Sequence, residues 1–241
     1  MICFTCDLDW AHDVVLADTL ELFRHWGVPC TFFATHATPV LANLDERVFE
    51  VGIHPNFNPL LSGASGSPET VLDNLLGLYP GTKGLRSHSL TTSTPLQELF
   101  ASRGLAYEAN LLLPYAKGLS PFTLWNGLLR LPYNWEDDVH CLYGKKFFST
   151  GLDLEAELNV LSFHPIHVYL NTEHLDRYEQ ARPFFHDPSS LMALRNKSKV
   201  PGVRDLLVDL LTMVASERRA VLPLIKLAET LPSTNHPGVG P

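Results

Sequence analysis

Short apolar runs alternate along this chain with longer segments whose apolar residues recur at helical spacing. The first run covers residues 2–6, and the segment 13–26 after it places five apolar residues near one helical face: Val15, Leu16, Leu20, Phe23 and Trp26. Gly27 follows, as glycine commonly does directly after a helix. A strand followed by a helix is the unit of α/β proteins, so this rhythm predicts a parallel sheet or barrel.

Six further apolar runs are predicted as strands, which makes about seven in total: 28–34, 48–53, 84–88, 105–109, 128–133 and 158–163. Four more helices are predicted from spacing and capping residues: 68–78, 93–103, 203–215 and 220–231. The segments 61–67 and 165–201 are expected to be loops. We therefore predict one α/β domain over residues 1–231, closed by C-terminal helices, and a disordered tail over 232–241.

Composition narrows the class of protein. Hydrophobic residues make up 45% of the 241 positions and charged residues 18%, which is typical of a folded globular chain. The net charge of −8 disfavours nucleic acid or an anionic membrane as partner. Two of the four cysteines lie in the first apolar run and a third in another, where cysteine usually packs as a small apolar residue. The N-terminus has no signal-peptide pattern, and no apolar run approaches about 18 residues. These features predict a cytoplasmic protein with reduced thiols and no transmembrane segment.

Side chains suited to catalysis or metal binding stand at the carboxyl ends of four predicted strands. They are Asp7 and Asp9 on the first strand, His54 on the third, Arg86 and His88 on the fourth, and His164 with His167 on the last. The active site of parallel α/β proteins forms at this end of the sheet. We therefore expect these side chains to surround one site.

Two carboxylates and several imidazoles at one strand end suit a hydrolytic metal site. Residues i and i+2 of a strand point to the same side, so Asp7 with Asp9, and Arg86 with His88, are expected to project together. One carboxylate can bind a divalent cation while the other, kept ionised by Arg86, accepts a proton from metal-bound water. Imidazole and carboxylate ligands with an open position are typical of catalytic zinc, which lowers the pKa of bound water to about 7.

The order of these motifs resembles the polysaccharide deacetylases, or NodB-homology domains, of carbohydrate esterase family four, over roughly residues 1–170. Residues 5–9 resemble the opening Thr-Phe-Asp-Asp motif, 28–33 the second-strand signature, 50–59 the Glu-x-Gly-x-His-x-x-x-His-Pro motif, 85–88 the Arg-x-Pro motif and 160–164 the terminal Leu-x-His motif. Within the family, the chain looks like the deacetylase-like proteins of O-antigen and surface-polysaccharide clusters.

The resemblance implies a distorted (β/α) barrel of about seven parallel strands and a metal-dependent hydrolysis that removes acetyl groups from N-acetylated sugars. It implies that Asp7 is the general base, that Arg86 orients it, and that His164 is the acid that protonates the leaving amine. It also implies that Asp9 and His54 bind the metal, for which zinc is the expected ion.

The residues 132–138 loosely resemble the fourth family motif, which supplies an aromatic wall and a carboxylate that tunes the acid. On this match Trp135 would form the wall. We consider Asn58, Trp135 and His167 as candidates for contacts with the substrate.

Two positions depart from the family pattern. Asn58 stands where the family has the second histidine of the metal motif, and an amide oxygen is a poor zinc ligand. His88 stands where the family has the proline of the Arg-x-Pro motif. We infer that His88 supplies the third ligand beside Asp9 and His54. Alternatively Asn58 or water completes a weaker site, or no metal binds.

The leading hypothesis is therefore a metal-dependent deacetylase that acts on an N-acetylated saccharide, such as a nucleotide-linked or lipid-linked sugar, in surface-polysaccharide synthesis. A second hypothesis is a catalytically inactive sugar-binding relative that kept the barrel and lost the full ligand set. A third is an amidohydrolase of the same fold that acts on a small amide. The sequence does not define the sugar, its linkage or the oligomeric state.

Overall fold

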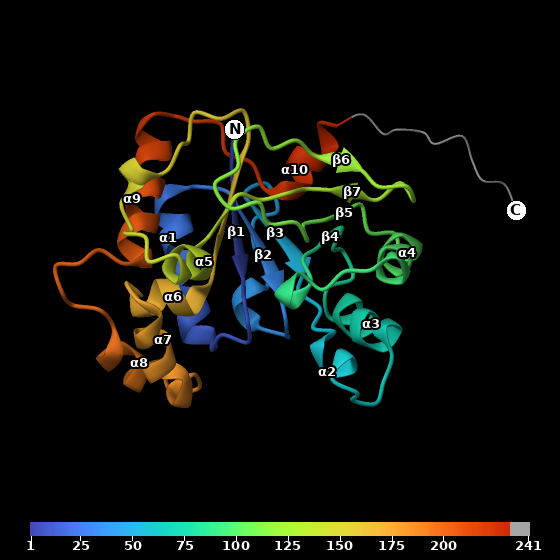
Figure 1. Ribbon diagram of the computed structural model, residues 1–241, viewed down its shortest axis with the longest axis horizontal. Helices are drawn as coiled ribbons and strands as arrows, with labels where there is room; N and C mark the ends of the chain where they lie inside the picture. The colour runs from blue at the N-terminus through green and yellow to red at the C-terminus, as the bar shows by residue number, and fades with distance from the viewer. Residues whose placement is uncertain (232–241) are drawn as a thin grey trace, which may run out of the picture.

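A curled sheet of nine strands forms the centre of the protein, whose computed structural model describes residues 1–231 (Figure 1). The strands follow the order β6-β7-β5-β4-β3-β2-β1-β9-β8. All neighbours pair in parallel except β6 and β7. The strands are β1 (Ile2–Asp7), β2 (Cys30–Ala34), β3 (Phe49–Ile53), β4 (Gly84–Leu85), β5 (Tyr107–Glu108), β6 (Phe122–Thr123), β7 (Leu129–Arg130), β8 (Trp135–Glu136) and β9 (Asn159–Phe163).

The predicted α/β class is confirmed, and the number of strands differs slightly from the prediction. Each of the seven predicted runs contains a strand of this sheet. The two additional strands, β6 and β8, are two residues long and lie at the two ends of the strand order. Strands this short carry no alternation that sequence reasoning can detect.

Ten α-helices surround the sheet: α1 (Asp13–Trp26), α2 (Asn58–Leu61), α3 (Pro68–Leu78), α4 (Thr94–Ser102), α5 (Asp137–Leu142), α6 (Pro165–Leu170), α7 (Leu175–Ala181), α8 (Pro188–Leu194), α9 (Val203–Ser216) and α10 (Leu224–Glu229), counted over the described residues. The prediction that 165–201 is a loop was wrong. The helices α6, α7 and α8 lie in it, and each is too short for a clear apolar period. Pro165 and Pro188 occupy the first position of α6 and α8, where proline favours helix initiation.

The two faces of β1 contact different parts of the core. Phe4 and Cys6 pack in the layer beneath α1 and α9. Thr5 and Asp7 face the inside of the curled sheet, where both contact Arg86. This alternation of period two directs the last acidic residue of the strand inward.

The helix α10 covers the amino-terminal end of the sheet, near the N-terminus in Figure 1. The backbone N–H of Leu224 donates to Oγ1 of Thr31 at 2.8 Å, and that of Ile225 donates to Oε2 of Glu50 at 2.8 Å. The helix begins four residues later than predicted, because residues 220–222 are extended and bond to Ile2 of β1. The carboxyl ends of the strands lie at the opposite end of the sheet.

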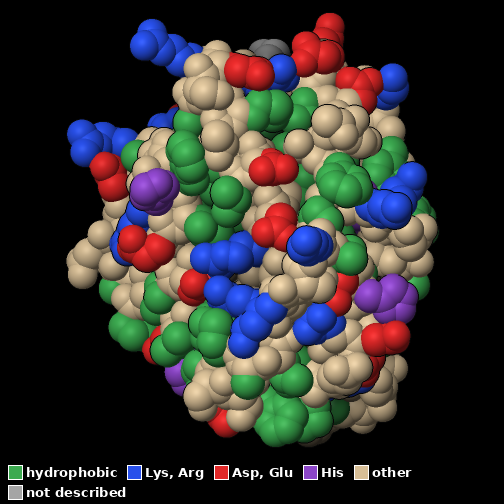
Figure 2. Space-filling view, turned by 90° about the vertical axis from the view of Figure 1, so that its left-hand side faces the viewer, with side chains coloured by type: hydrophobic (Ala, Val, Ile, Leu, Met, Phe, Trp, Pro, Cys, Tyr) green, Lys and Arg blue, Asp and Glu red, His purple; other side chains and the backbone are tan. Residues whose placement is uncertain are grey.

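On the side of α8 and α9, basic side chains gather near the middle of the surface among acidic and apolar ones (Figure 2). Arg204 of α9 forms an ion pair with Asp18 of α1, so the two helices are joined by charge as well as by apolar packing. No helix in the described part of the chain is long and apolar enough to cross a membrane. The predicted tail at 232–241 lies outside the described residues, and the single domain over 1–231 stays a prediction.

Candidate active site

The residues that the sequence placed at strand ends come together at the carboxyl end of the sheet. Asp7 ends β1, and Asp9 follows it in a turn with a backbone φ of 42°. His54 directly follows β3, and His164 directly follows β9. Aspartate tolerates this left-handed conformation better than most residues, and the turn brings the Asp9 carboxylate toward both histidines.

His88 lies in a turn and not on a strand as predicted. The strand β4 ends at Leu85, and His88 begins a 3-10 turn in which Ser89 and Leu90 both have a φ of 54°. The expected alternation of Arg86 and His88 on one strand is therefore wrong. A leucine with positive φ is uncommon and strained, so other contacts must hold this turn.

Asp9, His54 and His88 form a compact triangle of ligand atoms. Asp9 Oδ1 lies 3.2 Å from His54 Nε2 and 3.1 Å from His88 Nδ1, and the two nitrogens lie 3.3 Å apart. Zinc bonds of about 2.0–2.1 Å place the ligands of a tetrahedral site about 3.3 Å apart, so the three atoms fit one such ion. The His54 side chain is buried, whereas those of Asp9 and His88 are about one quarter exposed, which leaves access to a fourth position.

The charges in this triangle favour a carboxylate anion. Burial alone would raise the pKa of Asp9, but its contacts with His54 and His88 hold the pKa well below the usual range. The contact with Asp9 raises the pKa of His88. Two other groups of acids and histidines are close enough for a metal, and both include His164. His164 Nδ1 is engaged by a carboxylate at 2.6 Å, so Asp9, His54 and His88 are the best ligand set among the described residues.

Arg86 and Asp7 form a buried ion pair inside the sheet. Arg86 Nη1 lies 2.9 Å from Asp7 Oδ1 and also donates to Ser162 Oγ at 2.7 Å. The guanidinium stacks between the rings of Phe33 and Tyr133. An arginine that is completely buried and bound on several sides holds its partner in one orientation.

The segment that carries both Arg86 and His88 is fixed by Asn110. Oδ1 of Asn110 accepts the backbone N–H of Ser87 at 2.6 Å. Glu108, which pairs with Arg130, accepts the backbone N–H of Asn110 at 3.1 Å. Both contacts of Asn110 are buried, and no sequence motif indicated this residue.

His164 is held by Asp137, the first residue of α5. His164 Nδ1 lies 2.6 Å from Asp137 Oδ1, and its backbone N–H donates to Asp137 Oδ2 at 2.7 Å. Burial lowers the pKa of His164, but the charge of Asp137 outweighs it and raises the pKa well above the usual value. The other nitrogen, Nε2, faces the site at 3.7 Å from Asp9 Oδ2. Asp137 is the carboxylate that the loose match over 132–138 did not identify.

Glu136 lies close to both Asp7 and His164. Its Oε1 is 3.9 Å from His164 Nε2, and Tyr133 donates to its Oε2 at 2.8 Å. Burial and the nearby charge of Asp138 raise the pKa of Glu136 to about 8. The ligating atoms of Asp7, Glu136 and His164 lie within 4.8 Å of one another, so Asp7 and His164 face the same small space.

Two of the three candidates for substrate contacts have other partners. Trp135 is only 2% exposed, its ring packs against Phe163, and its Nε1 donates to His140. It belongs to the core and has no face available for a sugar ring. Asn58 donates to Ser89 Oγ and accepts from Thr91, so its amide supports the turn of His88.

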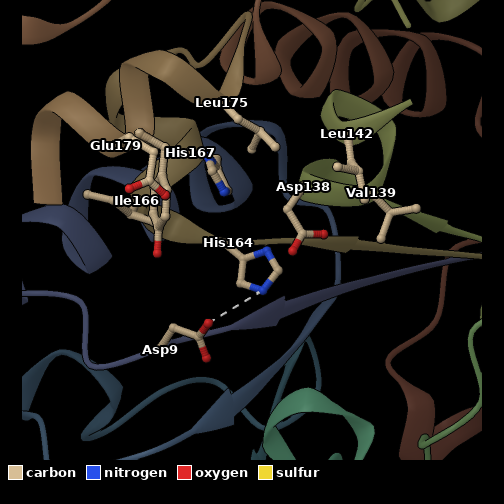
Figure 3. A pocket seen from close by; sticks show the side chains of 10 residues that line it. Asp9, Asp138, Val139, Leu142, His164, Ile166, His167, Leu175 and Glu179 are labelled. Carbon is tan, nitrogen blue, oxygen red and sulfur yellow. Dashed lines mark ion pairs between the residues drawn. The ribbon is translucent and has the colours of Figure 1, made fainter. Parts of the chain in front are cut away.

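The third candidate, His167, lines a pocket of about 230 Å³ together with Asp9 and His164 (Figure 3). His167 Nδ1 contacts Thr172 Oγ1 at 3.1 Å, and burial lowers its pKa. The pocket continues between α5 and α7, and α7 lies in the region 165–201 that was predicted to be a loop.

The sequence and the fold both have relatives among known proteins. Residues 4–182 match the family described as WbmS-like: Polysaccharide deacetylase. The structure is similar to that of WbmS from Bordetella bronchiseptica, a candidate polysaccharide deacetylase involved in O-antigen biosynthesis. The two are 46% identical, the alignment covers 88% of this chain and 90% of WbmS, and the TM-score is 0.82.

Two more distant structures share the fold. A candidate polysaccharide deacetylase from Mycobacterium smegmatis is 18% identical, with 99% of this chain and 94% of that chain covered and a TM-score of 0.56. The peptidoglycan N-acetylglucosamine deacetylase Bc1960 is 12% identical, with 93% and 86% covered and a TM-score of 0.50. No curated protein matches the sequence.

Proposed function

Because this chain belongs to the WbmS-like polysaccharide deacetylase family, we propose that it removes the acetyl group from an N-acetylated sugar of a surface polysaccharide in a metal-dependent hydrolysis. The observation that carries the metal dependence is the triangle of Asp9 Oδ1, His54 Nε2 and His88 Nδ1, whose sides of 3.1–3.3 Å suit one divalent ion. Zinc is the proposed ion, and the cytoplasm the proposed location.

A divalent ion held by Asp9, His54 and His88 would supply Lewis acidity to the amide carbonyl and lower the pKa of a water molecule. The other groups are residues of this chain. Asp7, oriented by Arg86, is placed to take a proton from the attacking water. A fixed carboxylate of this kind acts without having to reorganise in the transition state.

His164 is the proposed general acid. Asp137 holds Nδ1 and raises the pKa of the imidazole, which favours the protonated ring with its Nε2 proton directed to the site. Transfer of this proton to the amide nitrogen converts it into a leaving amine. The WbmS relationship supports a role in O-antigen synthesis, the process that the description of WbmS names.

Metal content and acetate release test this proposal together. Protein dialysed against zinc should retain about one ion per chain, as a site with three protein ligands implies. The variant His54→Ala should lose it, whereas His174→Ala, which changes an exposed histidine, should keep it. Acetate should be released from N-acetylhexosamine derivatives and not from a small amide such as allantoin. Retention of no ion would favour the inactive sugar-binding relative, and cleavage of allantoin would favour an amidohydrolase.

A further inference from the structure

The pocket beside His164 contains groups that the proposed reaction does not use. It extends from Asp9 and His164 to a wall made by α5 and α7 (Figure 3). Val139 and Leu142 contribute aliphatic surface to this wall, and Tyr178 contributes an aromatic ring. Such a mixture of apolar surface and few polar groups is typical of a site for a small organic ligand.

Asp138 is a polar residue of this wall and directly follows Asp137 in the sequence. Its neighbour Asp137 is committed to His164 by two hydrogen bonds. Asp138 Oδ1, in contrast, is buried and has no hydrogen-bond partner among the described residues. Figure 3 shows the Asp138 carboxyl group directed toward His164. A buried carboxylate oxygen without a partner is costly, and a ligand that donates a hydrogen bond would offset this cost.

The direction of proton transfer defines which part of the substrate lies here. His164 gives its proton to the amide nitrogen as the C–N bond breaks, so the nitrogen and the sugar that carries it must face His164. Water supplies the hydroxyl group of the acetic acid and gives its remaining proton to Asp7. Asp7 returns that proton to His164, and proton transfer from acetic acid to the amine yields acetate and a sugar ammonium. The product that lies beside His164 is therefore a cation.

The charge of the pocket is complementary to such a product. Apart from Asp9, which is assigned to the metal, and His164, which carries the proton for the leaving amine, the pocket has two acidic residues, Asp138 and Glu179, and no lysine or arginine lines it within the described part of the chain. A phosphate group on the same sugar ring would meet these carboxylates at short range, and like charges there reduce affinity.

We propose that this pocket binds the amino sugar itself, as a ring without phosphate, and that Asp138 accepts a hydrogen bond from its ammonium group. The proposal rests on the proposed deacetylation, because that reaction places the nitrogen beside His164. It makes Asp138 a residue that selects the sugar and retains the product.

Binding of glucosamine tests this role without relying on turnover. Wild-type protein should bind glucosamine more tightly than N-acetylglucosamine and more tightly than glucosamine 6-phosphate in an NMR titration. Asp138→Asn, which keeps the shape and removes the charge, should weaken glucosamine binding about tenfold or more, the effect of one charge-assisted hydrogen bond. Asp176→Asn, which changes an exposed aspartate of α7 outside the pocket, should bind as the wild type does.

The outcomes separate this inference from the deacetylation. If Asp138→Asn binds glucosamine as tightly as the wild type while acetate release is intact, the inference is wrong and the deacetylation stands. Glucosamine binding that depends on Asp138 in a protein without acetate release would support the pocket and contradict the reaction. The wild-type preference for glucosamine over its 6-phosphate needs no variant, and an equal or reversed preference overturns the proposal even if Asp138→Asn does not fold.

Discussion

Asn58 donates a hydrogen bond from Nδ2 to Oγ of Ser89 at 3.0 Å. Ser89 follows His88 in the strained 3-10 turn, and Thr91 at the end of that turn donates to Oδ1 of Asn58 at the same distance. Asn58, which stands at the second histidine position of the resembled metal motif, therefore contacts the segment that presents His88. The amide of Asn58 supports the turn, and the turn supplies the imidazole of His88.

We predict that His88→Ala and Asn58→Ala differ in their effect on metal binding. Removal of His88 deletes one of three protein ligands, so zinc affinity measured by calorimetry should fall by about 10²-fold or more, beyond the about 10–100-fold effect of an outer-shell residue. Removal of Asn58 only loosens the turn, so the loss of zinc affinity should lie within that smaller range. Equal losses in both variants would contradict the assignment of His88 as a direct ligand.

We predict that Asp7→Asn abolishes turnover without removing the metal. The amide cannot accept the proton of the attacking water, so kcat should fall by about 10² to 10⁴-fold. Zinc content should be that of the wild type, because Asp7 is bonded to Arg86 and is not one of the three proposed ligands. Full turnover of a metal-loaded Asp7→Asn variant would show that another group is the base.

We predict that Asp137→Asn shifts the alkaline limb of the pH profile of kcat/KM to lower pH. His164 must be protonated to act as an acid, and the charge of Asp137 is what raises its pKa. Without that charge the imidazole loses its proton at lower pH, so the active range narrows from the alkaline side. Asp176→Asn, which removes an exposed charge of α7 outside the pocket, serves as the control and should leave the profile unchanged. An unchanged alkaline limb in Asp137→Asn would exclude His164 as the titrating acid.

We predict that Glu136 makes the protein less stable as the pH rises. The pKa of Glu136 is raised from about 4.5, the value of an exposed glutamate as in the unfolded chain, to about 8 in the folded protein, because burial disfavours the carboxylate. The folded state therefore binds the extra proton between these values, and the stabilisation is present below pH 4.5 and lost as the pH rises through 8. Urea unfolding of metal-free protein should show this decline, and Glu136→Gln should remove it.

The exposed Glu155 provides the comparison for this measurement. Glu155→Gln should retain the decline of the wild type between pH 5 and 8. If Glu136→Gln retains it as well, a different group is responsible for the pH dependence.

We predict that Asn110→Ala lowers activity more than its distance from the reacting atoms suggests. Asn110 fixes the backbone of Ser87 between Arg86 and His88, so its loss should weaken zinc affinity and kcat together, each by about tenfold. Asn110→Asp keeps the acceptor oxygen for Ser87 and should recover much of both. A loss of thermal stability with normal affinity and kcat would indicate a structural role alone.

The sequence was sufficient to predict strands and helices that are marked by neighbouring residues in the chain. Seven strands were visible because each is an apolar run next to polar residues, and α1 and α3 have the predicted bounds because glycine, serine and proline mark their ends. The helices α6 to α8 were missed because six or seven residues give less than two full turns of periodicity.

For the site, the sequence indicated which residues converge, but it could not predict the conformation of His88 or the separate roles of the acids at 137 and 138. His88 lies in a turn with positive φ, which no local pattern indicates for Ser89 and Leu90. Asp137 and Asp138 are adjacent acids of one segment, and only the pairing of β8, which α5 follows, with β9 assigns one to His164 and the other to the pocket. Trp135 was a candidate for contact with the sugar, and its burial could not be predicted because it depends on distant residues such as Phe163.

The position of β1 in the sheet has a consequence for biosynthesis. This strand lies between β2 and β9, and its pairing with β9 joins Ile2 to Asn159. During translation the edge of β1 that pairs with β9 stays unpaired until more than a hundred further residues have been synthesised. Until then the nascent chain exposes an unpaired strand that carries the proposed base, so a chaperone that shields β1 would be expected to raise the yield of folded enzyme.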